Sequence, residues 1–156
     1  MGTKKKYFEV EKDAPAPLVV RTERRVRFEE VDVLGMVWHG RYPSYFEDGR
    51  IAFGDKYGMT YQRFMKEKTV APVVQMHFDY KQPLRFDELF IIETALHWAE
   101  SARLNFSYKI FNNKNVLAAS GYTVQLFTNP SGEMLLFTPE WLKDFQRDWK
   151  DRLWQE

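Results

Sequence analysis

The chain has 156 residues, of which 44% are hydrophobic and 29% charged, a composition typical of one globular domain with a contiguous core. The net charge of +1 at pH 7 gives no electrostatic reason to expect a nucleic-acid partner. The absence of cysteine excludes disulfides, thiolate metal sites and a cysteine nucleophile.

Residues 1–17 differ in composition from the rest of the chain. The lysines Lys4–Lys6 are followed by charged residues and by Pro15 and Pro17, which predicts a flexible leader with little capacity to pack. A single domain is expected over residues 18–156. Neither a secretory signal nor an apolar run long enough to cross a bilayer is found in the sequence, so we expect a cytoplasmic protein without membrane insertion.

A strand and a long helix are the first elements of the predicted domain. Branched and charged residues alternate loosely from Leu18 to Phe28, which predicts the strand. From Tyr42 to Tyr57 apolar residues recur every three or four positions, with Pro43 in the first turn and Gly58 after the last, which predicts the helix. Gly49 falls on its apolar face, where a missing side chain allows a backbone to approach closely.

A short helix, a series of strands and a final helix follow. Thr60 is a candidate cap for the short helix, in which Tyr61, Phe64 and Met65 are expected to face inward. Period-two alternation and residues with high strand propensity predict the strands. Thr138 and Pro139 are expected to begin the final helix, on which apolar residues repeated every four positions predict a packing stripe. The strands are predicted over Val74–Tyr80, Leu89–Trp98, Ala102–Phe111, Val116–Thr128 and a short segment ending near Phe137, and the stripe comprises Trp141, Phe145 and Trp149.

The order of these elements predicts an α+β domain in which an antiparallel sheet of about five or six strands wraps around a long central helix. Short links between consecutive strands favour antiparallel pairing. A single sheet of this kind leaves an edge strand exposed, so we expect two copies to pair into one continuous sheet.

The segment from Arg27 to Arg50 joins the first strand to the long helix, and it reads RFEEVDVLGMVWHGRYPSYFEDGR. It places a carboxylate, Asp32, and an imidazole, His39, close to the amino terminus of a helix. Unpaired amides and the helix dipole favour negative charge at such a terminus. This combination is suited to acyl transfer.

With these residues the sequence resembles the 4-hydroxybenzoyl-CoA thioesterase family of the hotdog superfamily, and within it the small acyl-CoA thioesterases associated with the Tol-Pal system. The resemblance is close over residues 28–50 and reduces to a pattern of strands elsewhere. The positions that match the family's pattern are Asp32, Gly35, His39, Tyr42, Glu47 and Arg50.

The resemblance implies a hotdog fold, hydrolysis of an acyl-CoA thioester without cofactor or metal, and assembly as a homodimer or homotetramer with the active site between subunits. It assigns Asp32 as the catalytic carboxylate and a backbone amide at or near His39 as the group that polarises the thioester carbonyl. The substrate-binding positions that it implies are Gly35, Val37, Trp38 and Tyr42. The sequence departs from the family's commonest pattern at Trp38, at residues 40–41 and at residues 33–34, and these changes bear on the acyl pocket more than on the chemistry.

Two chemical roles remain open for Asp32. It can act as a general base on water, or its carboxylate can attack the carbonyl and form an anhydride. The ring of His39 could add a donor or orient the acyl carbonyl, although a histidine at a helix start can also simply cap or pack.

Other polar residues have structural interpretations. Glu47 is expected to pair with Arg50 or with the neighbouring subunit. His77 and His97 lie in strand patterns without the spacing of metal ligands. Surface cations that could hold the nucleotide end of CoA have no spacing that singles one out; they are Lys81, Arg85, Arg103 and Lys109.

Two rival functions are compatible with the same fold. A hotdog hydratase or dehydratase would change the unsaturation of the acyl group and release no thiol. A non-catalytic acyl-CoA-binding protein would keep the fold, and replacement of Asp32 would leave its binding largely unaffected. The acyl chain, and the choice between CoA and acyl carrier protein, are not determined by the sequence.

Overall fold

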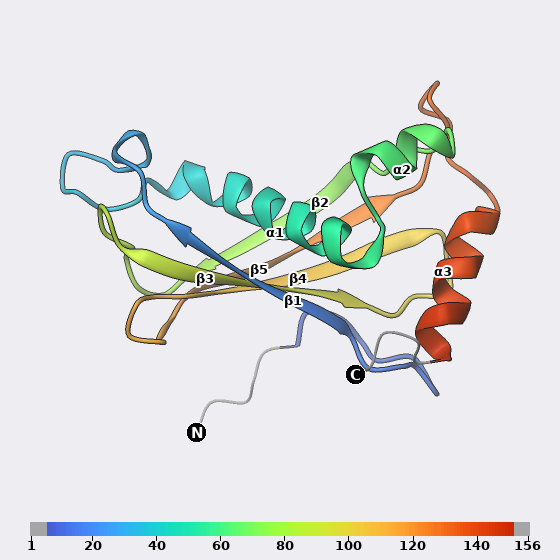
Figure 1. The fold of residues 1–156 in the computed structure, drawn as a ribbon, viewed down its shortest axis with the longest axis horizontal. Helices are drawn as coiled ribbons and strands as arrows, with labels where there is room; N and C mark the ends of the chain where they lie inside the picture. The colour runs from blue at the N-terminus through green and yellow to red at the C-terminus, as the bar shows by residue number, and fades with distance from the viewer. Residues whose placement is uncertain (1–5, 152–156) are drawn as a thin grey trace.

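The structure, a computed structural model, describes residues 6–151. One antiparallel sheet has the strand order β1-β3-β4-β5-β2, and helix α1 lies across one of its faces (Figure 1). The strands are β1 Leu18–Arg25, β2 Val73–Tyr80, β3 Leu89–His97, β4 Arg103–Phe111 and β5 Leu117–Leu126, and the helices are α1 Tyr42–Tyr57, α2 Tyr61–Lys66 and α3 Glu140–Lys150. The predicted α+β architecture is therefore confirmed, with five strands in the sheet.

The two faces of the sheet have different residues, because directly paired residues on neighbouring strands share a face. The inner face is turned toward α1 and carries the core. One row across it consists of Val20, Thr94, Tyr108, Gly121 and Phe78. On this row the ring of Phe46 from α1 stacks on Tyr108 at 4.0 Å and on Phe78 at 4.7 Å between ring centroids.

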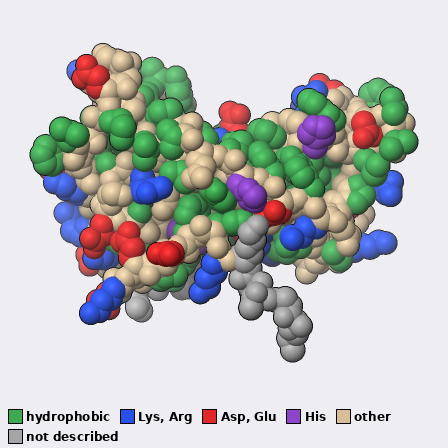
Figure 2. All heavy atoms as spheres, turned by 180° about the vertical axis from the view of Figure 1, so that it is seen from behind, with side chains coloured by type: hydrophobic (Ala, Val, Ile, Leu, Met, Phe, Trp, Pro, Cys, Tyr) green, Lys and Arg blue, Asp and Glu red, His purple; other side chains and the backbone are tan. Residues whose placement is uncertain are grey.

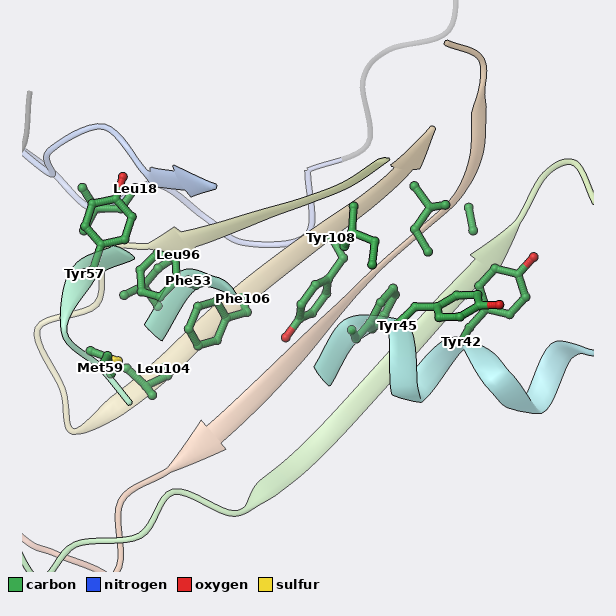
Figure 3. Packing of buried hydrophobic residues seen from close by; sticks show 14 of the residues in the cluster. Leu18, Tyr42, Tyr45, Phe53, Tyr57, Met59, Leu96, Leu104, Phe106 and Tyr108 are labelled. Carbon is green, nitrogen blue, oxygen red and sulfur yellow. The ribbon is translucent and has the colours of Figure 1, made fainter. Parts of the chain in front are cut away.

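Aromatic side chains fill the space between α1 and the sheet. Tyr42 and Tyr45 occupy one end of this core and Phe53 and Tyr57 the other, with Tyr108 between them (Figure 3). Tyr45, Phe53 and Tyr108 are each at most 1% exposed. Burial of side chains this large contributes about 1.5–3 kcal/mol each to the hydrophobic stabilisation of the domain.

Helix α1 begins and ends at the predicted residues, and its close contact with the sheet depends on Gly49. A Cβ atom at this position would overlap Thr94 Oγ1 on β3. The helix ends at Gly58, which has a φ of 81° and caps it with a bond to the Gly54 carbonyl. Thr60 then caps α2 by accepting a hydrogen bond from the Arg63 amide, as predicted.

Three predicted elements differ from the structure in extent or orientation. The first strand ends at Arg25 rather than Phe28, because residues 28–30 form a 3-10 turn. Tyr61 and Met65 do not face inward: their side chains are 73% and 60% exposed at the rim of a cavity. The expected short strand near residue 137 is reduced to a single bridge between Thr128 and Met134.

The final helix, α3, packs as the sequence predicts. Trp141, Phe145 and Trp149 are each less than 9% exposed. Trp149 meets Trp98, at the end of β3, edge to face with ring centroids 5.1 Å apart. The stripe is therefore part of the hydrophobic core.

Among residues 6–151, none of the helices combines the length and the hydrophobicity that a membrane span requires.

Candidate active site

Residues 28–41, here called the entry loop, connect β1 to α1 and fold back on themselves as a short hairpin. The Trp38 amide donates to the Glu30 carbonyl at 2.9 Å, residues 31 and 37 form a bridge, and the Asp32 amide donates to the Met36 carbonyl at 2.7 Å. Gly35 closes the turn with a φ of 75°, a conformation that favours glycine. The hairpin places Asp32 at the turn.

Asp32 itself holds this turn together. Its Oδ1 accepts hydrogen bonds from the amides of Leu34, at 2.9 Å, and Met36, at 3.2 Å. The residue is exposed, and Oδ2 has no hydrogen-bond partner within residues 6–151. One carboxylate oxygen is thus fixed by the backbone, and the other is directed to solvent or to a ligand.

The end of the entry loop supplies backbone donors. The 3-10 turn η2, His39–Arg41, leads directly into α1, and the amides of His39 and Gly40 donate to no backbone acceptor in the described part of the chain. The indole of Trp38 lies so close to Gly40 that a Cβ there would overlap it. A first turn with open amides is a site where negative charge on an oxygen is stabilised.

The position of His39 is fixed through its backbone carbonyl. Its carbonyl accepts a hydrogen bond from the Tyr80 hydroxyl on β2 at 2.9 Å, and its ring lies 5.0 Å from the Trp38 ring. Asp32 and His39 make no hydrogen bond to each other, because Asp32 is at the turn of the hairpin and His39 lies beyond its base. A substrate that contacts both Asp32 and His39 would therefore have to span the distance between them.

The other two positions implied for substrate binding lie deeper. Val37 is 8% exposed and its amide donates to the Leu84 carbonyl, while Tyr42 is 3% exposed. Burial raises the pKa of Tyr42 to about 12, so its phenol is neutral at physiological pH and acts as a donor rather than a base. Both side chains are buried in the core, where they anchor the end of the entry loop and the start of α1.

The base of the entry loop is anchored by a buried carboxylate that sequence reasoning had not singled out. Glu30 is 3% exposed, and its carboxylate binds the Arg24 guanidinium at 2.8 Å and accepts from the Arg27 amide at 2.8 Å. Arg24 also pairs with Asp48 of α1. The available signal was the spacing of Arg27 and Glu30, which places an acid at the third position of a turn.

A large open cavity lies along the carboxyl-terminal half of α1. It has a volume of about 1020 Å³ and is bounded by α1, by α2 and by residues 68–72. Much of its wall is apolar, including Phe53, Met59, Phe64, Leu104 and Phe106. Figure 2 shows this molecule hollowed between two raised ends, with hydrophobic side chains along the hollow.

Glu47 and Arg50 line the cavity but do not pair with each other. The ion pairs within residues 6–151 include none between them. The Arg50 guanidinium donates instead to the Tyr108 hydroxyl at 2.9 Å, and that hydroxyl lies 2.7 Å from Thr123 Oγ1. The first predicted role of Glu47, pairing with Arg50, was therefore wrong within one chain.

His77 and His97 lie on the outer face of the sheet, away from α1. Nε2 of His77 is 3.0 Å from Asp79 Oδ2, and Nε2 of His97 is 2.7 Å from Ser107 Oγ. Burial lowers the pKa of His97, with a further contribution from Lys109. In the described part of the chain no group of three or more potential ligand residues is arranged to hold a metal ion.

Comparison with known proteins places this chain in a family. Residues 26–145 match the model of the thioesterase-like superfamily. The acyl-CoA thioesterase YbgC of Haemophilus influenzae is 30% identical over 111 residues, which cover 70% of this chain and 80% of that protein. The chain therefore belongs to the thioesterase-like superfamily, and its enzyme class is thioester hydrolase.

Solved structures agree with this assignment. A DHNA-CoA thioesterase from Staphylococcus aureus superposes with a TM-score of 0.75 at 26% identity, covering 83% of this chain and 89% of that one. The protein TT1821 from Thermus thermophilus superposes with a TM-score of 0.71 at 32% identity, covering 81% and 94%. The hotdog fold and the family resemblance predicted from residues 28–50 are confirmed.

Proposed function

We propose that this protein hydrolyses an acyl-CoA thioester to a free acid and CoA, with Asp32 as the reacting carboxylate and the amides of His39 and Gly40 as donors to the thioester carbonyl. The observation that carries the proposal is that the entry loop presents, at the turn of its hairpin, a carboxylate oxygen without a partner among residues 6–151 and, at its end, open amides that lead into α1.

The chemistry follows from these groups. In the general-base route, Asp32 Oδ2 takes a proton from water while the water oxygen bonds to the carbonyl carbon; the carbon–sulfur bond then breaks and CoA leaves as the thiolate. In the nucleophilic route Oδ2 bonds to that carbon first, the carbon–sulfur bond breaks and CoA leaves as the thiolate, and water then hydrolyses the resulting anhydride to release the acid and restore the Asp32 carboxylate. In both routes the carbonyl oxygen gains negative charge, which the amides of His39 and Gly40 stabilise.

The apolar cavity is the part of this chain best suited to hold the acyl group. Within one chain, however, it is remote from Asp32. The entry loop is attached near the end of β2, through Tyr80 and Leu84, whereas the cavity is bounded by residues 68–72, just before β2 begins. The eight residues of β2 span about 24 Å.

Antiparallel pairing of β2 with β2 of a second copy would remove this separation. β2 is an edge strand, and its residues Val74 and Tyr80 are 55% and 51% exposed. The other edge, β1, has the exposed charged residues Arg21, Glu23 and Arg25, which oppose such pairing. In a two-fold dimer through β2, the entry loop of one subunit lies beside the cavity of its partner, so the active site is shared.

Thiol release from short, long and aromatic acyl-CoAs tests the reaction. In Asp32→Asn the amide oxygen can still accept from the Leu34 and Met36 amides, so the turn is kept and only the charge is lost. We expect kcat to fall by at least about 100-fold. The control is Glu29→Gln, an exposed carboxylate on the same loop, which should keep full activity. Equal activity of Asp32→Asn and the wild type would exclude Asp32 as the reacting group, and a changed acyl chain without thiol would indicate a hydratase.

Mixed dimers test the shared site. Ala71→Trp fills the cavity, and Asp32→Asn inactivates the loop. In a shared site, a dimer of these two variants has one intact loop facing one intact cavity. Random mixing should therefore restore about a quarter of wild-type activity, because half of the dimers have one working site of two. A site contained within one chain would show no recovery.

A further inference from the structure

The chain before β1 lies on the outer face of the sheet, opposite α1 (Figure 1). Residues 6–17 are here called the N-terminal arm. Two aromatic residues, Tyr7 and Phe8, make its contacts with the strands. The region that matches the thioesterase-like family begins at residue 26, so the arm lies outside the part of the chain shared with that family.

Tyr7 binds the outer face over β2 and β5. Its hydroxyl donates to Asp79 Oδ2 at 2.7 Å and lies 2.7 Å from Ser120 Oγ. Its ring centroid is 5.1 Å from that of Tyr122 and 5.7 Å from that of His77. The residue is therefore attached both by hydrogen bonds and by ring contacts.

Phe8 extends the contact across the sheet to β3. Its ring centroid is 5.2 Å from that of His97 and 5.4 Å from that of Tyr122. Neighbouring outer-face residues are almost inaccessible: Asn105 is 9% exposed and Val124 is 3% exposed. Two consecutive side chains thus reach from the edge strand β2 to the end of β3.

The far end of the arm is fixed as well. The Trp149 indole of α3 donates to the Ala16 carbonyl at 2.9 Å. Between the two attachments the arm bulges outward, with Val10 72% exposed. The arm is therefore held at both ends, and it adds bulk to the outer face.

We propose that the N-terminal arm occupies the outer face of the sheet and so limits assembly to the dimer formed through β2. This inference rests on the dimer proposed above. Two sheets that stack face to face lie about 10 Å apart, and their side chains fill that space. Here Tyr7 and Phe8 occupy that space over β2, β5 and the end of β3 on each subunit. A second dimer cannot stack on this face unless Tyr7 and Phe8 leave their positions on Tyr122.

Without the arm, the outer face would present a surface suited to self-association. Tyr122 and His77 lie on neighbouring paired strands; the His77 side chain is 38% exposed with the arm in place, and both rings would become more accessible together. Aromatic side chains beside small polar ones are typical of protein interfaces. A stacked pair of dimers, with four chains, is the assembly that loss of the arm contacts should produce.

The test is the mass in solution of the full chain and of Tyr7→Ala/Phe8→Ala, measured by light scattering over a range of concentrations. The wild type should have twice the chain mass of 18.7 kDa at all concentrations. The variant should rise toward four chains as its concentration increases. The control Glu9→Ala/Val10→Ala alters exposed arm residues and should remain at two chains.

The outcomes separate the two proposals. A wild type of four chains, or a folded variant that stays at two, overturns the role of the arm and leaves the thioesterase proposal intact. A wild type of one chain overturns the β2 dimer itself. Thermal unfolding verifies that the double variant is folded; if it is not, Phe8→Ala alone is measured and must show the same increase in mass. Thiol release by a folded variant should match the wild type, because the arm lies on the face opposite α1.

Discussion

The buried carboxylate at the base of the entry loop offers a sharp test of how this fold supports its site. Glu30 is 3% exposed and Arg24 has 21% of its side chain exposed, so solvent screens this pair only weakly. Glu30→Ala would leave the Arg24 guanidinium with Asp48 and the Tyr45 ring, and would leave the Arg27 amide without its acceptor. Removing one partner of a buried pair costs about 3 kcal/mol.

Thermal unfolding followed by circular dichroism measures this effect. For a domain of this size, a loss of about 3 kcal/mol lowers Tm by roughly 6–12 °C. The matched control is Glu29→Ala. Glu29 is the adjacent residue, its side chain is 67% exposed, and its pair with Arg27 is 3.9 Å long, so the change in unfolding free energy should stay within about 0.5 kcal/mol.

The same variant should also impair catalysis, since Glu30 anchors the strand of the hairpin that carries Asp32. We expect a lower kcat with a smaller change in KM, at a temperature where the variant is folded. Equal values of Tm for the Glu29 and Glu30 variants would refute the reasoning, because it would show that burial of the pair contributes nothing.

Two further predictions concern packing and pH. Gly49→Ala should destabilise the protein by about 1–3 kcal/mol in chemical denaturation, and adding Thr94→Ala should recover part of the loss, because Thr94 Oγ1 is the first atom that the new Cβ meets; an unchanged or raised stability of Gly49→Ala would contradict the close approach of α1 to β3. Burial lowers the pKa of His97 from its usual 6.5, so the unfolded chain binds a proton that the folded chain resists, and stability should fall as pH decreases below about 6.5. The loss between about pH 7.5 and 5.5 should be smaller in His97→Gln, and identical pH profiles would show that His97 does not contribute.

Several features of this protein were determined by the sequence because they depend on residues near one another in the chain. Helix α1 begins and ends at the predicted residues, since apolar periodicity, Pro43 and Gly58 act within one or two turns. The five strands of the sheet and the apolar stripe of α3 were likewise predicted from patterns of neighbouring residues. The segment containing Asp32 and His39 also indicated the family, which the comparisons confirmed.

Only the tertiary structure decided which surfaces meet. In the sequence Glu30 shows only a capping spacing from Arg27, and it becomes an anchor because the sheet brings Arg24 to it while α1 brings Asp48 to Arg24. Tyr61 and Met65 follow a helical pattern, yet they border a cavity, because no element within residues 6–151 covers them.

The N-terminal arm illustrates the same distinction. Its lysines and prolines gave no indication of a docking position, and Tyr7 contacts Asp79 at a separation of 72 residues. The composition of a segment indicates only its local conformational preferences. The burial of a side chain, and the groups that it binds, depend on contacts between distant segments, and these are set only when the chain has folded.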